Sequence, residues 1–258
     1  GCKDTASQLI EFPYGDGIDV AMGGGRRHFL PAETNDPEDE GAVGNRTDGR
    51  DLTQEWVDAR EGATYVFDQA GFDSIDASTT GPVLGLFERS HMEYEYDRAE
   101  DTAGEPSLAE MTATAIEILS RNEEGFYLQV EAGRVDHAAQ AGNAYRMLTD
   151  NIAFDEAVQT TLDMVNLEET LIIVTADHAH TVTLAGYAQR GNPILGLVRG
   201  LDAQGLPVDE ATLAADEKPY TSIAFINGPG AIVGERPAPT EEEAQNPEYR
   251  QQALIPLS

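Results

Sequence analysis

Acidic and imidazole side chains follow directly after an apolar run in the second half of the chain. Residues 171–174 read Leu-Ile-Ile-Val, and Asp177, His178 and His180 come next. Carboxylate oxygen and imidazole nitrogen are the ligands that zinc takes where no thiolate is present. The spacing therefore indicates a metal site. The alternative is that Asp177 caps a helix and both histidines are surface residues.

A second apolar run, further upstream, has the same arrangement. Residues 126–130 read Phe-Tyr-Leu-Gln-Val, and they are followed by Glu131 and then by Asp136. Paired metal ions stabilise the attacking and leaving oxygens of a phosphoryl transfer. Two apolar runs that each end in metal-type ligands therefore favour a two-metal hydrolase.

The two runs predict the elements that would position these ligands. Their length and β-branched composition are typical of strands buried on both faces of a parallel sheet. In open α/β sheets, chemistry lies beyond the carboxyl ends of such strands. We also expect short strands at 18–22, 64–67 and 83–87, a helix ending within residues 1–12, and helices at 51–61, 107–121 and 141–165. This alternation favours an α/β fold, a mostly parallel doubly wound sheet with helices on both faces.

The composition limits the classes of partner. The formal net charge is −31, from 47 acidic and 16 basic residues, and the only lysines are Lys3 and Lys218. Such acidity disfavours binding to nucleic acid or to an anionic membrane. It also suggests the hypothesis of adaptation to high salt, because a dense carboxylate surface holds water and ions. A run of about 18 apolar residues is absent from the sequence, so no membrane span is predicted.

Both ligand-bearing segments resemble those of a known family. VEAGRVDHAAQ at 130–140 and VTADHAHTVTLAGY at 174–187 resemble the metal-binding segments of alkaline phosphatases, the animal-type enzymes most closely. Further motifs occur in the family's order: GCKDTASQL, MGGGRRHFLP, NRTDGRDLTQEW, LGLFE, PSLAEMTATAIEILSRN, FINGPG and PEYRQQALIPL. The resemblance implies the alkaline-phosphatase fold and hydrolysis of phosphomonoesters through a phosphoserine intermediate, with two Zn²⁺ ions and one Mg²⁺ ion.

The resemblance also assigns roles to single residues. It implies that Glu131 binds magnesium and that Asp136 binds the first zinc. Asp177 and His178 match ligands of the second zinc. His180 matches a histidine that orients a zinc-binding carboxylate, and such outer contacts strongly affect metal sites.

One position departs from the family pattern. The family has a histidine four residues after the position of Asp136, where both ligands share one helical face. This chain has Gln140 there, and an amide oxygen is a weaker zinc ligand than imidazole. Three outcomes stay open: a loosely bound first zinc, a different metal, or a site without function. We favour weakened or altered metal preference.

A calcium site is also implied by the resemblance. Animal-type enzymes bind Ca²⁺ through two glutamates, a backbone carbonyl and a downstream aspartate, and the matching positions are Glu38, the carbonyl of Phe87, Glu88 and Glu105. Glu105 stands in place of the aspartate, after a one-residue insertion. Hard oxygen ligands suit calcium. In a chain this acidic, the same glutamates could alternatively be solvated surface charges.

The expected organisation is an α/β metallohydrolase domain over 1–186, with a peripheral region at 30–106, and a crown-like dimerisation subdomain over 187–258. Glycine and proline recur in the second part, with short strands expected at 194–198, 221–226 and 231–233. The resemblance implies a homodimer in which Tyr187 reaches the neighbouring subunit. Ordinary edge packing is the alternative for Tyr187.

Several expected features of the family are not found within the sequence. The nucleophilic serine and the phosphate-binding arginine are expected upstream of GCKD, on a segment that would be this chain's partner, and the last zinc histidine beyond Ser258. Cys2 is expected either to pair with an upstream cysteine, in a periplasmic or extracellular protein, or to be a buried thiol. The alternatives in function are a catalytically silent binding or dimerisation module and a related phosphodiesterase or sulfatase.

Overall fold

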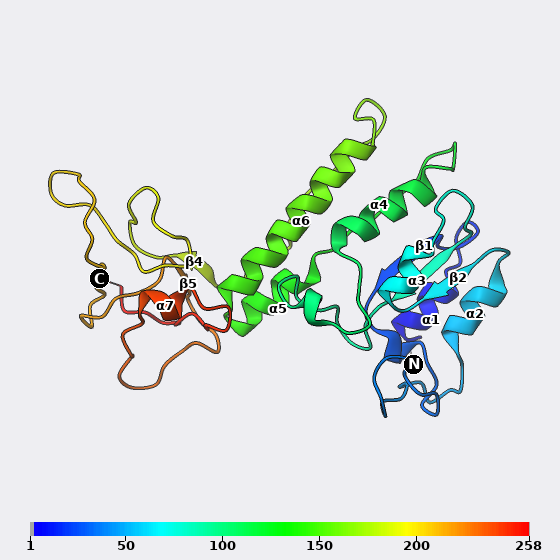
Figure 1. Cartoon of the computed structure of the whole chain (residues 1–258), viewed down its shortest axis with the longest axis horizontal. Coiled ribbons are helices and arrows are strands. Elements are labelled where there is room, and N and C mark those ends of the chain that lie inside the picture. Colours follow the sequence, from blue (N-terminus) through cyan, green and yellow to red (C-terminus); the bar gives the residue numbers. More distant parts are fainter. Residues whose placement is uncertain (1–2, 258) are drawn as a thin grey trace. The chain divides into compact units, whose positions relative to one another are not determined.

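The chain forms two compact units in a computed structural model that describes residues 3–257 (Figure 1). Unit 1 comprises Gly1–Glu131 and Ala153–Thr170, and unit 2 comprises Ala132–Ile152 and Leu171–Ser258. Cys2 lies outside the described residues, so its expected pairing stays a prediction.

Unit 1 is built on a three-stranded parallel sheet. Its strand order is β1 (Val20–Gly23), β3 (Val83–Leu86) and β2 (Thr64–Val66), and β3 pairs in parallel with both neighbours. All four residues of the central strand are buried. A strand buried on both faces needs an apolar sequence, and Val-Leu-Gly-Leu supplies one. The predicted parallel sheet is therefore confirmed, with three of its strands close to the expected positions.

Helices cover both faces of this sheet. Alternate side chains of a strand point to opposite faces, so each face has its own apolar cluster. On one face, Leu84 and Leu86 pack with Leu52 and Trp56 of α2 (Leu52–Ala59). Helix α1 (Thr5–Ile10) adds Ala6, Leu9 and Ile10 to the same cluster. The expected helix positions at 1–12 and 51–61 are confirmed.

The other face of the sheet carries a second apolar cluster. Val66 of β2 and Phe87, directly after β3, pack there with Phe72 of α3 (Gln69–Asp73). Met22 of β1 and Met111 of α4 (Leu108–Leu119) complete the cluster. Two 3₁₀ turns, η1 (Arg26–His28) and η2 (Arg98–Glu100), lie in the connections of unit 1.

Helix α4 begins with the capping box that the sequence predicts. The Ser107 hydroxyl accepts a hydrogen bond from the Glu110 N–H at 3.2 Å, and the Glu110 carboxylate accepts one from the Ser107 N–H at 2.8 Å. Ser107→Ala is expected to lower the free energy of unfolding by about 1 kcal/mol, because one helix N–H loses its acceptor. Urea unfolding followed by circular dichroism measures this. Glu110→Gln is the control and should cost less, since glutamine also completes a capping box.

Two predicted strands do not form. Residues 126–130 and 171–174 have no assigned strand. Most of their large residues are exposed, with Tyr127 at 84% and Leu171 at 82%, and the others are half-buried. A strand needs a neighbour that supplies ladder hydrogen bonds, and no such pairing to these runs is present within residues 3–257. The expectation of two buried strands is therefore wrong for this structure, although the ligand-bearing residues still follow the two runs.

Helix α6 (Ala144–Met164) is the longest helix, with 21 residues. It matches the helix predicted at 141–165. Its small side chains Ala144, Ala153 and Ala157 are buried, whereas Ile152 is exposed. Among the described residues, no helix combines the length and the apolar character that a membrane crossing requires.

Unit 2 contains α5 (Gly133–Ala141), the first part of α6 up to Ile152, and the short helix α7 (Glu241–Ala244). Its strands β4 (Val182–Leu184) and β5 (Ile223–Phe225) form an antiparallel pair. The strand expected at 221–226 is confirmed in part. The runs at 194–198 and 231–233 form only isolated bridges, Leu197 with Thr221 and Ala231 with Ala253.

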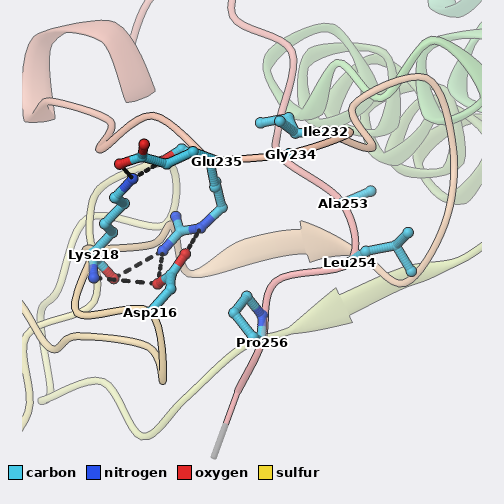
Figure 2. A pocket seen from close by; sticks show the side chains of 9 residues that line it. Asp216, Lys218, Ile232, Gly234, Glu235, Ala253, Leu254 and Pro256 are labelled. Carbon is cyan, nitrogen blue, oxygen red and sulfur yellow. Dashed lines mark hydrogen bonds and ion pairs between the residues drawn. The ribbon is translucent and has the colours of Figure 1, made fainter.

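Unit 2 contains a pocket of about 340 Å³ that Arg236 helps to line. Figure 2 shows Asp216 and Lys218 among the side chains around it. The Arg236 guanidinium donates to both carboxylate oxygens of Asp216, at 2.7 and 2.8 Å, and to Gln252 Oε1 at 2.6 Å. It also donates to the carbonyls of Pro219 and Lys218. These hydrogen bonds use all five N–H donors of the Arg236 guanidinium. Arg236 therefore connects three loop segments and has no donor left for a ligand.

Candidate metal centres

The first candidate centre lies entirely in unit 2. Asp136 is in the first turn of α5, where a carboxylate is favoured by the positive end of the helix dipole. His178 and His180 lie in the loop that precedes β4. That loop is anchored to the end of β5, because the Ile226 N–H donates to the Thr181 carbonyl at 2.8 Å.

The side chains of this centre converge on the Asp136 carboxylate. Asp136 Oδ1 lies 2.5 Å from His180 Nε2 and 3.5 Å from His178 Nε2. The two imidazole rings meet edge to face, with centroids 4.7 Å apart. Potential ligand atoms of Asp136, His178 and His180 all lie within 4.8 Å of one another. This donor set and separation suit a zinc ion, which takes carboxylate oxygen and imidazole nitrogen.

Asp177 lies beside the same group. Its Oδ2 atom is 3.4 Å from His178 Nε2, and its Oδ1 atom accepts from the His178 N–H at 2.9 Å. The Asp177 side chain is 87% exposed, and the side chains of His178 and Asp136 are 52% and 36% exposed. An open carboxylate–imidazole group can exchange ligands with solvent. His180 has a φ of 48°, a left-handed conformation that is uncommon outside glycine and that turns the loop at this point.

Gln140 lies one helical turn after Asp136, on the same face of α5. Its amide nitrogen donates to Asp136 Oδ2 at 3.0 Å. An amide nitrogen has no lone pair for a metal ion. In this arrangement Gln140 supports the carboxylate of Asp136 and occupies its second oxygen.

Four of the predicted residues belong to the same unit. Asp136, Asp177, His178 and His180 belong to unit 2, whereas Glu131 is an exposed residue of unit 1. The role of Glu131 stays a prediction.

The second candidate centre lies in unit 1 and is made of carboxylates. Potential ligand atoms of Glu38, Glu88 and Asp101 lie within 4.8 Å of one another. Glu88 follows β3 and the buried Phe87. Glu105 is only 2% exposed, and its Oε1 atom accepts from the Glu93 N–H at 2.9 Å. Two of the three predicted glutamates, Glu38 and Glu88, therefore gather with a residue that the sequence did not single out, Asp101.

Glu38 is held by a buried arginine. Arg26 is fully buried, and its guanidinium donates to Glu38 and, at 2.8 Å, to Asp36 Oδ1. Burial would raise the pKa of Asp36, but hydrogen bonds from Arg26 and from the N–H groups of Glu38 and Asp39 lower it below its usual range. Sequence reasoning missed both Arg26 and Asp36, because neither the GGGRR motif nor the acidic loop indicates that their side chains meet.

Burial and mutual repulsion perturb the carboxylates of the second centre. Burial and the neighbouring Glu88 raise the pKa of Glu105 to about 8. Burial and the nearby Glu38 raise the pKa of Glu88 to about 7. Carboxylates crowded in this way favour either a bound proton or a bound cation.

These shifts predict a pH-dependent stability of unit 1. Below pH 4.5 Glu105 is protonated in both states, but between pH 4.5 and 8 only the folded chain keeps the proton, so stability falls as pH rises. Melting temperatures in EDTA are expected to decrease over this range, and saturating Ca²⁺ should oppose the decrease by binding the ionised form. Glu105→Gln should flatten the EDTA profile. An equally steep profile in that variant would contradict the assignment.

Comparison with known proteins places the chain in a family. The family model described as alkaline phosphatase matches residues 1–258. The chain belongs to the alkaline phosphatase family. A membrane-bound alkaline phosphatase of Bombyx mori is 40% identical over 248 residues, covering 93% of this chain and 42% of that protein. The tissue-nonspecific alkaline phosphatase of Gallus gallus is 40% identical over 266 residues, covering 100% of this chain and 48% of that protein.

Solved alkaline phosphatases share the fold. The enzyme of Thermus thermophilus is 35% identical with a TM-score of 0.50, over 61% of this chain and 29% of that chain. The alkaline phosphatase of the Antarctic bacterium TAB5 has a TM-score of 0.53 at 23% identity, over 72% and 48% of the two chains. From the coverage of the Bombyx mori and Gallus gallus proteins, this chain spans about half the length of the curated alkaline phosphatases that it matches.

Proposed function

We propose that this chain supplies part of the metal centre of a phosphomonoester hydrolase. The observation that carries the proposal is the convergence of His178 and His180 on the Asp136 carboxylate. Membership of the alkaline phosphatase family supplies the reaction class. The serine nucleophile is proposed to come from a polypeptide segment upstream of residue 1.

The donor set fits zinc. Asp136 would hold the first Zn²⁺ ion, and Asp177 with His178 would hold the second. When bound, zinc lowers the pKa of a coordinated water or alcohol and so makes a nucleophile available near neutral pH. His180 contacts Asp136 at 2.5 Å, which supports a role in orienting that carboxylate.

Magnesium is the third proposed cofactor, with Glu131 as its carboxylate ligand. Hard oxygen ligands and retained waters suit Mg²⁺. One solved relative, a mutant of the TAB5 alkaline phosphatase, has Mg bound in its M3 site. Glu131 is exposed, so its carboxylate is accessible to an ion.

The test is an assay with and without the upstream polypeptide. The chain alone is expected to bind zinc but not to turn over p-nitrophenyl phosphate, because it lacks the nucleophile. Co-expression with the segment encoded upstream should give hydrolysis that EDTA abolishes and zinc restores. A lack of turnover in both preparations would contradict the proposal and favour a silent module. Turnover of a phosphodiester or a sulfate ester in place of the monoester would favour a related hydrolase.

Gln140 offers a direct test of the altered centre. Gln140→His is expected to raise zinc affinity by about tenfold or more, because imidazole is a better zinc ligand than an amide. Gln140→Asn, which keeps the amide on a shorter stem, is the control. Metal content after dialysis and competition with a chromogenic chelator measure the change. Equal occupancy and affinity in wild type and Gln140→His would contradict it.

Gln140 also supports the second candidate function, a catalytically silent binding or dimerisation module. Its amide, and not an imidazole, faces Asp136. A module of this kind would keep the fold and the ion pairs of the loop without turnover.

We propose the second centre as a Ca²⁺ site that uses Glu38, Glu88, Glu105 and the carbonyl of Phe87. The support is the grouping of the half-buried carboxylates of Glu38, Glu88 and Asp101, the burial of Glu105 and the raised pKa values of Glu88 and Glu105. Calcium takes six to eight oxygen ligands. Ca²⁺ would replace the protons that these groups otherwise retain.

A homodimer with Tyr187 at its contact is also proposed, in a periplasmic or extracellular location. The Tyr187 side chain is 95% exposed, so it is accessible to a second subunit. Light scattering of the complete protein and of its Tyr187→Ala variant tests this. Adaptation to high salt is proposed from the net charge of −31. If adding NaCl does not raise the unfolding temperature, that part of the proposal fails.

A further inference from the structure

The carboxylate centre of unit 1 contains two oxygen atoms that are buried without a hydrogen-bond partner among the described residues. These are Oδ2 of Asp101 and Oε2 of Glu105. A buried carboxylate oxygen without a partner is costly, by about 1–3 kcal/mol or more. Ligand oxygens of Asp101 lie within 4.8 Å of those of Glu88 and Glu38, and a cation bound there would supply the partner that the buried Asp101 oxygen lacks.

In each of these two carboxylates, one oxygen accepts a hydrogen bond from a backbone N–H, and the other oxygen has no hydrogen-bond partner among the described residues. Asp101 Oδ1 accepts from the Ala103 N–H at 3.3 Å, and Glu105 Oε1 accepts from the Glu93 N–H at 2.9 Å. The backbone hydrogen bond sets the rotamer in each case. The second oxygen is thereby held in place before any ion arrives, and preorganised ligands bind with less loss of entropy.

The cations around this centre make their hydrogen bonds elsewhere than to these two oxygens. Arg98 donates to both carboxylate oxygens of Glu95, at 2.9 and 3.0 Å, and to the backbone carbonyl of Glu105 at 3.3 Å. Arg26 donates to Asp36 and to Glu38. The centre therefore combines four carboxylates with a guanidinium that is bound to only one of them, Glu38.

We propose that Asp101 is a direct ligand of the calcium site and that Glu105 joins it through its free oxygen, which makes a four-carboxylate site. This inference rests on the calcium site proposed above and extends its ligand set. Asp101, which follows η2, is added to Glu105, which was the one carboxylate downstream of Glu88 that the family resemblance implied. The additional carboxylate raises the negative charge of the site, and the affinity of calcium sites increases with ligand charge and rigidity.

The test is a Ca²⁺ titration of the full chain by calorimetry, after removal of metals with a chelating resin. Asp101→Asn keeps the Oδ1 acceptor for the Ala103 N–H and replaces the free Oδ2 atom, together with the negative charge, by an NH₂ group that does not bind a cation. It is expected to weaken Ca²⁺ binding in unit 1 by about tenfold or more. Glu100→Gln, an exposed neighbour in η2 that loses the same charge, is the matched control and should bind Ca²⁺ like the wild type.

If Asp101→Asn folds poorly, a second variant, Asp101→Ser, and a second measurement, the melting temperature with and without Ca²⁺, still test the proposal. Asp101→Ser should likewise lose the increase in melting temperature that Ca²⁺ gives to the wild type. Wild-type affinity in both Asp101 variants, with binding lost in Glu88→Gln, would overturn the role of Asp101 and leave the calcium site standing. Absence of Ca²⁺ binding in the wild type, or its persistence in Glu88→Gln, would overturn the calcium site and this inference together.

Discussion

Asp136→Asn is expected to lower the zinc affinity of the chain by more than about 100-fold. Loss of an outer contact already costs about 10–100-fold at metal sites, and Asp136 is the residue on which both histidines converge. Competition with a chromogenic chelator measures the affinity, and circular dichroism verifies the fold. Asp155→Asn, an exposed change of the same charge in unit 1, is the control and should leave zinc binding unchanged.

The same titration separates the two possible roles of His180. If His180 only orients Asp136, His180→Ala should weaken zinc binding by about 10–100-fold. If His180 is itself a ligand, the loss should equal that of Asp136→Asn. Wild-type affinity in Asp136→Asn would remove the basis for placing a zinc ion at this carboxylate.

Arg26→Met is expected to lower the free energy of unfolding of unit 1 by about 3–5 kcal/mol. The reason is that Asp36, whose side chain is fully buried, would be left without its partner, and an uncompensated buried charge is strongly destabilising. Trp56 is the only tryptophan and is buried in the core of unit 1, so its fluorescence reports the unfolding of this unit in urea.

Arg50→Met is the matched control for Arg26→Met. Arg50 also pairs with two carboxylates, Glu55 and Glu11, but its side chain is 32% exposed. Exposed ion pairs contribute about 0–1 kcal/mol, so this variant should be almost as stable as the wild type. Adding Asp36→Asn to Arg26→Met should recover part of the loss. Equal costs at the two arginines would show that burial of the pair does not determine the effect.

The sequence determined the elements whose pattern is local. The apolar stripes of α2, α4 and α6, together with the capping box of α4, placed these helices within a few residues of their observed bounds. A capping box needs only residues three positions apart, so Ser107 and Glu110 could be paired in advance. The short runs that became β1, β2 and β3 were also identified, because each is apolar and bounded by turn-forming residues.

The sequence misplaced the two strands that were expected to carry the ligands. Residues 126–130 and 171–174 have strong strand character, yet they remain unpaired within the described part of the chain. Side-chain pattern gives a segment its preference for an extended backbone. The ladder that makes it a strand comes from another segment, which a local pattern does not contain.

The composition of the sites was readable from the sequence, but their assembly was not. The residues 177–180 and Asp136 stood out by type and spacing. His180 and Asp136 are 44 positions apart in the sequence. Their contact forms because the loop before β4 lies against α5. No motif marked Asp101, and the motif that contains Arg26 did not show which side chain it contacts. Only the structure places Asp101 near Glu38 and Glu88, and Arg26 against Glu38. The sequence determines which atoms are available as ligands and which helices can form. A site also needs short distances between those atoms and a suitable dielectric environment, and both arise only when distant segments pack together.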